Sequence, residues 1–414
     1  MTTKNNIPAG YKDSAVGIIP QEWEVATLGK LGKVISGLTY SPDDISDTGI
    51  LVLRSSNIQN GMLCMADNVY VNTVSYNPVK TGDILICVRN GSKNLIGKSA
   101  YITPHYEGVA FGAFMSIYRS ANNNYLKHLF NSDIFYKNVH RNLGATINSI
   151  NGNDLKKFVI PIPPLEEQRK IAEILGVWDE AIEKQSRLIE KLELRKRALM
   201  QRLLTGRTRL PGFTTPWQKV KLGEIGKFDK GAGVPKEKIV SEGCKAITYG
   251  EIYTKHDHVI KDFASYIDSD TAQTSKQIST GAILFAGSGE TLEDIGKCVA
   301  FIDNDNAYAG GDIIIFNPTI EVDSLVLSYI LNSPIAIAQK RRYGQGHSVV
   351  HIYQKDLSRI EFELPSLPEQ KAIAEVLTTA DDEIATHRKK LDALRLQKRG
   401  LMQQLLTGKT RVKI

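Results

Sequence analysis

The chain has 414 residues, of which 42% are hydrophobic and 23% are charged. This length is too great for one ordinary hydrophobic core and suits two to four domains of a globular protein. No apolar run approaches the roughly 20 residues of a membrane-spanning helix. The first residues also lack the apolar core of a signal peptide, so we expect a cytoplasmic protein.

Cysteine usage and net charge narrow the chemistry further. The four cysteines are scattered without a CxxC pair, which favours free thiols over disulfides or a metal site. The formal net charge of +7 and the isoelectric point near 9.0 fit a polyanionic partner, although charge alone does not identify one.

The first globular segment, residues 1–162, is predicted to consist of short strands and turns. Its clearest strand is the apolar run 83–88, and a turn follows at 89–92 with Ile-Gly-Lys at 96–98. A glycine turn with small polar side chains and a lysine can approach a phosphate backbone closely. The alternative is a hairpin turn with an incidental lysine.

A long helix is predicted from about residue 165 to residue 204, within the segment 163–206. Apolar residues recur at steps of four and three, which is the seam of a coiled coil over about five heptads. The seam residues are Ile171, Leu175, Trp178, Ile182, Ile189, Leu192, Leu199 and Leu203. The polar Gln185 and Lys196 either specify register and partner or lie at a solvated edge. Gly206 is placed to end the helix with a left-handed residue.

The charge of this helix is polarised along its length. Residues 166–183 include six acidic and two basic side chains, and residues 184–209 include nine basic and two acidic ones. This order complements the helix dipole. It also favours antiparallel pairing with a similar helix, because parallel pairing would stack like charges. At 1.5 Å per residue, about 39 helical residues span roughly 58 Å, or one to two turns of DNA with its ~35 Å repeat.

The second globular segment, residues 207–364, has strand-like runs at 282–286 and 312–316 and a turn with Ile-Gly-Lys at 295–297. Phe285–Gly289 resembles the F-x-G-x-G loop of adenosylmethionine-dependent methyltransferases, but no Asn/Asp-Pro-Pro-Tyr/Phe motif follows it. His256 and His258 lack the further ligands that a metal site needs, so a polar loop is expected. A GxxxxGK[ST] nucleotide loop is absent from the sequence.

The last segment, residues 365–414, repeats the long helix. Its seam residues are Ile373, Leu377, Ala380, Ile384, Leu391, Leu394, Leu401 and Leu405, with the polar His387 and Lys398. Ser366–Glu369 has the form of a capping box, and Gly408 is placed to end the helix.

These matches belong to an internal repeat. From Gly144 onward, the first half reappears 202 residues later without a gap, and Trp23 with its neighbours recurs at Trp217 with a shift of 194 residues. The predicted fold class is therefore α+β: two α/β modules joined by two long helices in an antiparallel intramolecular coiled coil, with a pseudo-twofold internal repeat.

Several motifs resemble those of a known family. The phrase Ile-Pro-Ile-Pro-Pro-Leu-Glu-Glu-Gln at 160–168, followed by Ile-Ala, is echoed at 364–374. It resembles the repeated signature of type I restriction–modification specificity (S) subunits. Gly82–Leu85 with the turn after it, and the opening Gly17–Trp23, are also similar to that family. The second copy has Ala282 where the first has Asp83, so we assign this aspartate no role.

The resemblance implies a division of labour. Two target-recognition domains, 1–162 and 207–364, would each recognise one half of a split DNA site. The conserved helices, 163–206 and 365–414, would set the gap and dock two methyltransferase (M) subunits. Restriction (R) subunits would add ATP-dependent cleavage. Adenine methylation with S-adenosylmethionine, and the ATP and Mg²⁺, would belong to these partners, so this chain is expected to be non-catalytic and to bind no cofactor or metal.

The candidate DNA contacts lie in the two turns and in the basic, glycine-rich stretch 341–347. They are Arg89, Asn90, Lys93, Lys98, Ser288, Lys297, Arg341, Arg342, Gln345 and His347. Arg suits bidentate contacts to guanine, and Gln suits adenine; the alternative for each is a solvated surface residue. Two other interpretations of the chain stay open: a coiled-coil scaffold that binds DNA without sequence preference, and a methyltransferase or nuclease that uses the Phe285 loop.

Overall fold

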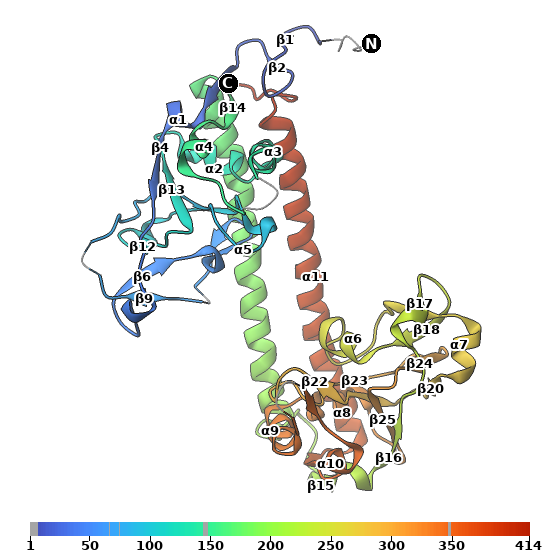
Figure 1. Cartoon of the computed structure of the whole chain (residues 1–414). Helices are drawn as coiled ribbons and strands as arrows, with labels where there is room; N and C mark the ends of the chain where they lie inside the picture. The colour runs from blue at the N-terminus through green and yellow to red at the C-terminus, as the bar shows by residue number, and fades with distance from the viewer. Residues whose placement is uncertain (1–6, 66, 74, 144–147, 347–348) are drawn as a thin grey trace. The chain divides into compact units, whose positions relative to one another are not determined.

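The computed structural model describes residues 7–414 except 66, 74, 144–147 and 347–348. The chain forms two compact units. The first unit comprises residues 1–186 and 389–414, and the second unit comprises residues 187–388. Each unit contains one globular region and one part of each long helix, α5 (Leu165–Leu203) and α11 (Leu367–Leu405) (Figure 1).

The globular region of the first unit is built on two small sheets. The central strand of the antiparallel sheet is β10 (Ile84–Cys87), whose four residues are all buried, as its apolar run predicts. The sheet order is β11-β10-β13-β4, with β11 at Ser99–Tyr101, β13 at Met115–Arg119 and β4 at Lys33–Ser36. The second sheet has the order β12-β6-β9-β5, with β12 at Ala110–Phe111, β6 at Ile50–Leu53, β9 at Tyr70–Val71 and β5 at Ile45–Ser46.

Short helices connect this region to the first part of α5 (Figure 1). They are α2 (Asn123–Leu129), α3 (Asp133–Asn142) and α4 (Gly152–Lys156). Their apolar side chains share one core with Ile171 and Leu175 of α5 and with Met402 and Leu405 of α11. The other described elements are β1 (Tyr11–Lys12), β2 (Ile19–Pro20), β3 (Glu24–Thr27), α1 (Leu28–Leu31), β7 (Ile58–Gln59), β8 (Met62–Leu63) and β14 (Val159–Ile162).

The same strand order recurs in the second unit. Its antiparallel sheet has the order β16-β25-β21-β23, with β16 at Gly226–Lys230, β25 at Ile313–Pro318, β21 at Ile283–Ala286 and β23 at Cys298–Ala300. The second sheet has the order β17-β19-β18-β24-β20, with β17 at Ile239–Val240, β19 at Ser265–Ile267, β18 at Cys244–Ile247, β24 at Ala307–Ala309 and β20 at Lys276–Ile278. The pairing of β18 with β24 is parallel, like that of β6 with β12.

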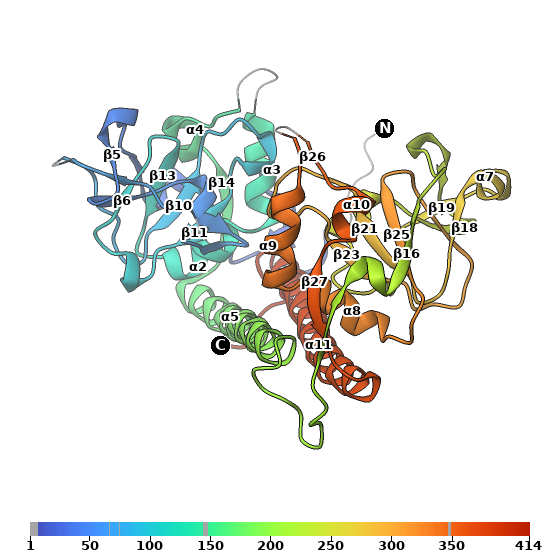
Figure 2. The same ribbon diagram turned by 90° about the horizontal axis from the view of Figure 1, so that it is seen from below.

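Both faces of β21 are buried, which explains its continuous apolar run. One face packs with α8 (Ser324–Leu331), which lies along this sheet in Figure 2, and with the start of α11. The other face packs against the second sheet and α6 (Tyr249–Thr254). The remaining elements are β15 (Gln218–Lys221), α7 (Ser269–Thr274), β22 (Ser288–Gly289), α9 (Pro334–Tyr343), β26 (Val350–His351), α10 (Gln354–Leu357) and β27 (Glu361–Leu364).

Both long helices end as predicted. Gly206 and Gly408 have φ values of 65° and 71°. The amides of Gly206 and Gly408 donate to the carbonyls of Leu203 and Leu405, three residues earlier, as in a Schellman end. The predicted capping box at the start of α11 is not formed in this way. The Glu369 carboxylate instead accepts hydrogen bonds from Arg209 and Trp217, because a buried carboxylate is stabilised more strongly by a guanidinium than by an amide.

Most of the predicted seam residues are inaccessible to solvent. The buried ones are Ile171, Leu175, Ile182, Ile189, Leu192, Leu203, Ile373, Leu377, Ala380, Ile384, Leu391 and Leu405. Trp178, Leu199, Leu394 and Leu401 are half-buried.

The two seam lysines are paired with acidic residues of the opposite helix segment. In the first unit Lys398 forms an ion pair with Asp179, and in the second unit Lys196 forms one with Asp381. These lysine side chains are only 16% and 12% exposed, so they lie within the helix contact and not at a solvated edge.

In the second unit, further ion pairs define the helix direction. Arg209 pairs with Glu369, and Glu193 pairs with Arg388. The partner number on α11 falls as the number on α5 rises, so the two segments are antiparallel within this unit. In the first unit Glu167 pairs with Arg411 and Asp179 pairs with Lys398, in the same sense.

His128 of α2 is expected to make the first unit sensitive to acid. Burial, and then the nearby Lys398 and Lys127, lower the pKa of His128 to about 2; the Asp179 carboxylate lies 3.5 Å from its Nδ1. A histidine whose pKa falls on folding stabilises the fold fully above its unfolded pKa near 6.5, and this stability is lost as the pH falls below that value. Lowering the pH from 7 to 5 should therefore cost up to about 2 kcal/mol of unfolding free energy.

Urea unfolding at pH 7 and pH 5 measures this effect. The variant His128→Gln should show a smaller loss of stability between the two pH values than the natural protein. His105→Gln, at an exposed histidine of the same unit, is the control and should leave the pH dependence unchanged. Equal pH dependence in the natural protein and in His128→Gln would contradict the prediction.

Candidate nucleic-acid interface

The four candidate residues of the first unit lie in or beside the turn between β10 and β11. Arg89 and Lys93 are exposed, and Lys93 begins the short helix η3 (Lys93–Leu95). The guanidinium carbon of Arg89 lies 5.7 Å from the centre of the Phe114 ring. Both cations are therefore available to solvent, as phosphate-binding side chains must be.

Asn90 and Lys98 are engaged within the fold. The Asn90 side-chain amide donates to the hydroxyl of Ser55 at 3.0 Å, and its carbonyl oxygen accepts from the amide of Ser92 at 2.9 Å. The ammonium of Lys98 donates to the carbonyl of Ser55 at 3.4 Å. These two side chains hold the turn against the segment that follows β6.

That segment, residues 54–57, was not singled out from the sequence. The Asn57 side chain is completely buried and organises it. Its carbonyl oxygen accepts from the amide of Arg54 at 2.8 Å, and its amide donates to the carbonyls of Cys64 and Asp67 at 3.1 Å. Arg54 Nη2 then lies 2.6 Å from the Asp67 carboxylate. The buried amide thus places an arginine and its acidic partner together.

A groove of about 530 Å³ opens beside this ion pair in the first unit. Its walls come from residues 38–45, 54–56 and 112–115, with Asp67 at the edge. Phe114, on one wall, is 56% exposed, which is unusual for a phenylalanine. Arg89 and Phe114 connect the groove to the predicted turn.

In the second unit, the equivalent lysine is also engaged within the fold. The ammonium of Lys297 donates to the carbonyl of His256 at 2.7 Å and lies 3.4 Å from the carbonyl of Tyr253 in α6. Burial lowers the pKa of Lys297. Ser288 Oγ is 3.0 Å from Nδ1 of His351, across the β22–β26 pair. The lysine of the repeated Ile-Gly-Lys turn therefore binds main-chain carbonyls of the segment after β6 in the first unit and after β18 in the second unit.

The remaining candidates lie at and after the end of α9. Arg342 and Gln345 are exposed, and Arg341 forms an exposed ion pair with Glu293 at 2.8 Å. His347 lies outside the described residues. Lys340, which was not predicted, is buried and donates to the carbonyl of Gly296 at 2.7 Å, so it fixes the same Ile-Gly-Lys turn from the other side.

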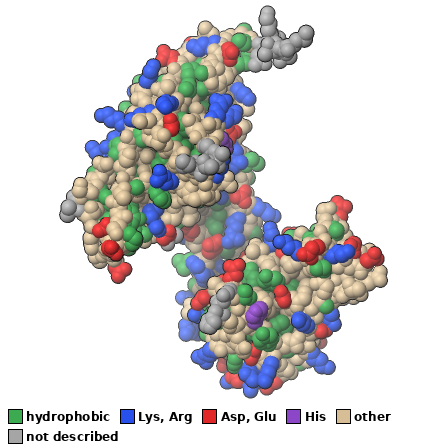
Figure 3. Space-filling view, in the orientation of Figure 1, with side chains coloured by type: hydrophobic (Ala, Val, Ile, Leu, Met, Phe, Trp, Pro, Cys, Tyr) green, Lys and Arg blue, Asp and Glu red, His purple; other side chains and the backbone are tan. Residues whose placement is uncertain are grey.

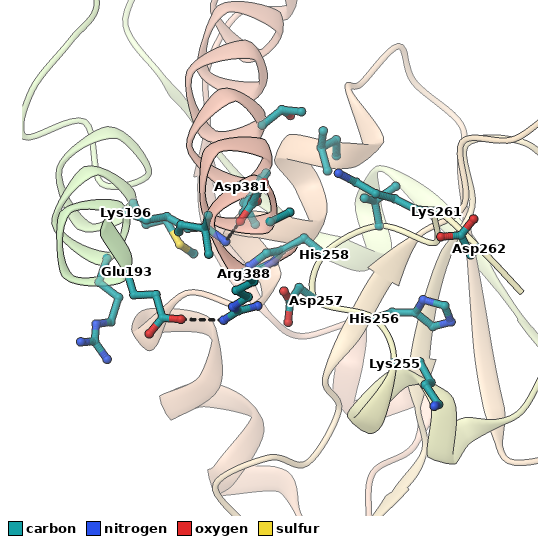
Figure 4. Close-up of a pocket in the computed structure, with 18 of the residues that line it drawn as sticks. Glu193, Lys196, Lys255, His256, Asp257, His258, Lys261, Asp262, Asp381 and Arg388 are labelled. Atoms are coloured by element: carbon teal, nitrogen blue, oxygen red, sulfur yellow. Dashed lines mark hydrogen bonds and ion pairs between the residues drawn. The ribbon is translucent and has the colours of Figure 1, made fainter. Parts of the chain in front are cut away.

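A cavity of about 610 Å³ in the second unit lies between the loop 255–264 and parts of both long helices (Figure 4). Four of the charged side chains that line it form two ion pairs, Lys196 with Asp381 and Arg388 with Glu193. The ring of His258 stacks on Tyr329, with centroids 4.1 Å apart. Burial and the nearby Lys196 lower the pKa of His258 to about 3. The two ion pairs join α5 to α11, and the globular region contacts α11 through the Tyr329 hydroxyl, which donates to Asp381, and through Lys261, which pairs with Asp382.

A buried glutamate attaches the globular region of the first unit to the helix segments. Glu167, near the start of α5, is completely buried. Its carboxylate accepts from the Trp23 indole at 2.8 Å and from Arg411 Nε at 2.7 Å. Arg411 also binds Glu22 at 2.7 Å. One carboxylate thus connects the first strands, α5 and the segment after α11.

The second unit has the same attachment. Glu369, which is also completely buried, accepts from the Trp217 indole at 3.0 Å and from Arg209 Nε at 2.6 Å. Glu167, Arg209 and their equivalents Glu369 and Arg411 are related by the 202-residue shift, and the two tryptophans by the shift of 194. The repeated residues thus mark the attachment of each globular region to the helix segments.

The described surface carries charges of both signs. On the face drawn in Figure 3, basic and acidic side chains are interspersed over each unit. Among the described residues, no group of three or more His, Cys, Asp or Glu side chains is arranged to hold a metal ion. Nor does any helix in the described ranges carry an apolar stretch of the length that crossing a membrane requires.

Several known proteins are similar to this chain in sequence or in fold. MjaX, a putative type I restriction enzyme specificity subunit of Methanocaldococcus jannaschii, is 28% identical over 97% of both chains. The specificity subunit of the type I restriction enzyme StySPI, from Salmonella potsdam, is 35% identical over 38% of this chain and 36% of that protein. The type I restriction–modification S subunit of M. genitalium, a solved structure, has the same fold, with a TM-score of 0.57 and 17% identity over 98% of both chains.

The sequence model of one protein family matches the chain twice. This family is described as the type I restriction modification DNA specificity domain, and it matches residues 20–194 and 214–396. Each match covers one globular region and most of the helix that follows it. The chain therefore belongs to the family of type I restriction–modification DNA specificity proteins.

Proposed function

We propose that each globular region of this specificity subunit recognises one half of a bipartite DNA site. The observation that carries the proposal is that the two globular regions have the same backbone framework but different side chains on the surface. The sheet order, the Ile-Gly-Lys turn and the buried glutamate recur in both units. The side chains at the equivalent surface positions differ, for example Arg89 against Ser288. Two modules with one frame and different surfaces suit the recognition of two different half-sites.

We also propose that α5 and α11 form one antiparallel intramolecular coiled coil, with a pseudo-twofold repeat, that sets the gap between the half-sites. The buried seam residues within each unit support this arrangement, as do the ion pairs between the helices, Lys196 with Asp381 and Lys398 with Asp179. Exposed apolar residues on both helices, such as Val177, Leu194 and Leu396, are candidates for contact with two methyltransferase subunits.

The reaction is assigned to the partner subunits in this proposal. S-adenosylmethionine would bind to the methyltransferase subunits, and ATP with Mg²⁺ to restriction subunits when these are present. The geometry of Phe285–Gly289 supports a non-catalytic role for this chain. Phe285 is completely buried in β21, and Gly289 pairs with Val350 of β26, so this stretch is part of the sheet framework.

Genome-wide mapping of methylated adenines tests the proposal. Cells that express a cognate methyltransferase are compared with and without this gene, and a single split motif should appear only with the gene. The purified chain alone should show negligible methylation. If the partner is expressed and bound but the motifs do not differ, the chain is a scaffold without sequence preference, whose DNA affinity should be uniform and steeply salt-dependent.

Arg341→Ala should affect only one half of the motif. The exposed guanidinium at the end of α9 would contact DNA from the second unit after leaving Glu293. Loss of a bidentate base contact costs about 1–3 kcal/mol at that base pair. Binding of the complex to a library of sites measures the change, and the half-site recognised by the first unit is the internal control. A uniform loss across all sequences would identify a phosphate contact instead.

A further inference from the structure

We infer that Arg54, held by Asp67, recognises a guanine in the half-site of the first unit, with the groove beside Phe114 as the surface that receives the base-pair edge. The inference rests on the proposed DNA-recognition function and adds a named residue and base to it. Neither Arg54 nor Asp67 belongs to the turn that the sequence indicated. Both are brought to that turn by the buried Asn57.

The ion pair between Arg54 and Asp67 leaves guanidinium donors that could bind a guanine. Asp67 occupies one donor of Arg54 Nη2 at 2.6 Å, and Arg54 Nε is buried. Within the described part of the chain, Nη1 has no hydrogen-bond partner, and Arg54 is among the residues that line the groove. A guanidinium fork matches the O6 and N7 acceptors of guanine in the major groove. A carboxylate behind the fork fixes its plane before DNA binds, which reduces the entropy lost on contact.

The position of Arg54 is also fixed by hydrogen bonds to its neighbour in the chain. Asn90 and Lys98 bind the hydroxyl and the carbonyl of Ser55, the residue that follows Arg54. Recognition residues need such rigid support because small displacements weaken a bidentate contact. The sequence candidates Asn90 and Lys98 are thus positioning residues for Arg54, whereas Arg89 and Lys93 remain free to bind phosphates beside the groove.

The second unit has the same frame with different chemistry at this position. Thr248 follows β18 as Arg54 follows β6, and its amide donates to Glu251 at 2.7 Å as that of Arg54 donates to Asn57. The next residue, Tyr249, is 42% exposed where the first unit has the half-buried Ser55. A constant backbone frame with exchanged side chains is the pattern expected where two modules recognise different bases.

The experiment compares methylated motifs in cells that express the cognate methyltransferase with the natural chain, Arg54→Gln, Asp67→Asn or Lys93→Ala. For the natural chain we expect a guanine at a fixed position of one half-site. Arg54→Gln should lower the preference for that guanine about ten-fold or more. Asp67→Asn, which keeps the side-chain shape, should weaken the preference at the same position. Lys93→Ala should reduce methylation of all sites without changing the motif, as loss of a phosphate contact does.

The half-site of the second unit serves as the internal control in each variant. Its retention shows that the variant is folded and assembled. If Arg54→Gln does not assemble, Asp67→Asn decides the question. A split motif that is unchanged in the folded Arg54 and Asp67 variants would overturn this inference and leave the proposed function intact. A natural chain that yields no split motif would remove the proposed function, and the inference with it.

Discussion

Arg411→Ala is expected to destabilise the first unit by about 2 kcal/mol. Removing one partner of a buried ion pair typically costs about 3–5 kcal/mol; we expect less here because the Arg411 side chain is 37% exposed. The loss arises because Glu167 is completely buried and would keep only the Trp23 indole as a charge-stabilising donor. Hydrogen exchange measured by mass spectrometry should show faster exchange in residues 7–186 and little change in 187–388.

The repeat provides a matched experiment. Arg209→Ala should destabilise the second unit in the same way, because Arg209 binds Glu369 with the same geometry. Lys413→Ala, at an exposed position two residues beyond Arg411, is the control and should have no effect. Glu167→Gln in the Arg411→Ala background should recover part of the loss, since it removes the unpaired charge. If Arg411→Ala is as stable as the natural protein, the ion pair between Arg411 and Glu167 does not stabilise the first unit.

Deleting one matched heptad from each long helix is expected to shorten the gap in the recognised site. The stretches 185–191 and 387–393 are equivalent by the 202-residue shift. The end positions of the two stretches, 185 with 393 and 191 with 387, sum to 578, as do the numbers of the ion pair Arg195 with Glu383, so the stretches lie opposite each other in the antiparallel arrangement. Seven residues span about 10 Å of helix, or about three base pairs at ~3.4 Å each.

Motif mapping in cells checks this deletion. Both half-sites should keep their sequences while the spacing between them falls. Deleting 185–191 alone should abolish recognition of any split site, because it shortens α5 and not α11, so that the ion pairs on the two sides of the deletion could no longer form together. Altered half-site sequences, or an unchanged gap in the matched deletion, would contradict the proposal that the two helices set the gap.

The helices could be predicted because their signals are local. Periodic apolar residues specify a long helix whatever lies beside it, and Gly206 and Gly408 supply the positive φ that ends each one. The strand β10 was predictable for the same reason, as an apolar run bounded by turn residues. The contacts of the buried Glu167 and Glu369 could be predicted only in part. Trp23 and Arg209 recur in the repeat, but the sequence does not show that both kinds of residue meet a buried glutamate.

The candidate DNA interface was less predictable because its contacts are distant in the sequence. Lys98 and Lys297 look like phosphate ligands in a glycine turn, yet each donates to a backbone carbonyl about forty residues away. Arg54 and Asp67 lie in a loop without periodicity, and only the buried Asn57 brings them together. Hydrogen bonds to main-chain carbonyls do not appear in side-chain patterns, so these internal hydrogen bonds of the two lysines could not be predicted from the sequence.

The division of the chain into units also bears on its synthesis. The second unit is continuous, residues 187–388, and can fold as soon as it leaves the ribosome, whereas the first unit needs residues 389–414. At 5–20 residues per second, the N-terminal region waits on the order of ten seconds or more for Arg411. During that time Trp23 and Glu167 lack their guanidinium partner. Two nascent chains on one messenger RNA therefore have time to exchange this segment, and we expect slower translation to increase the fraction of swapped dimers.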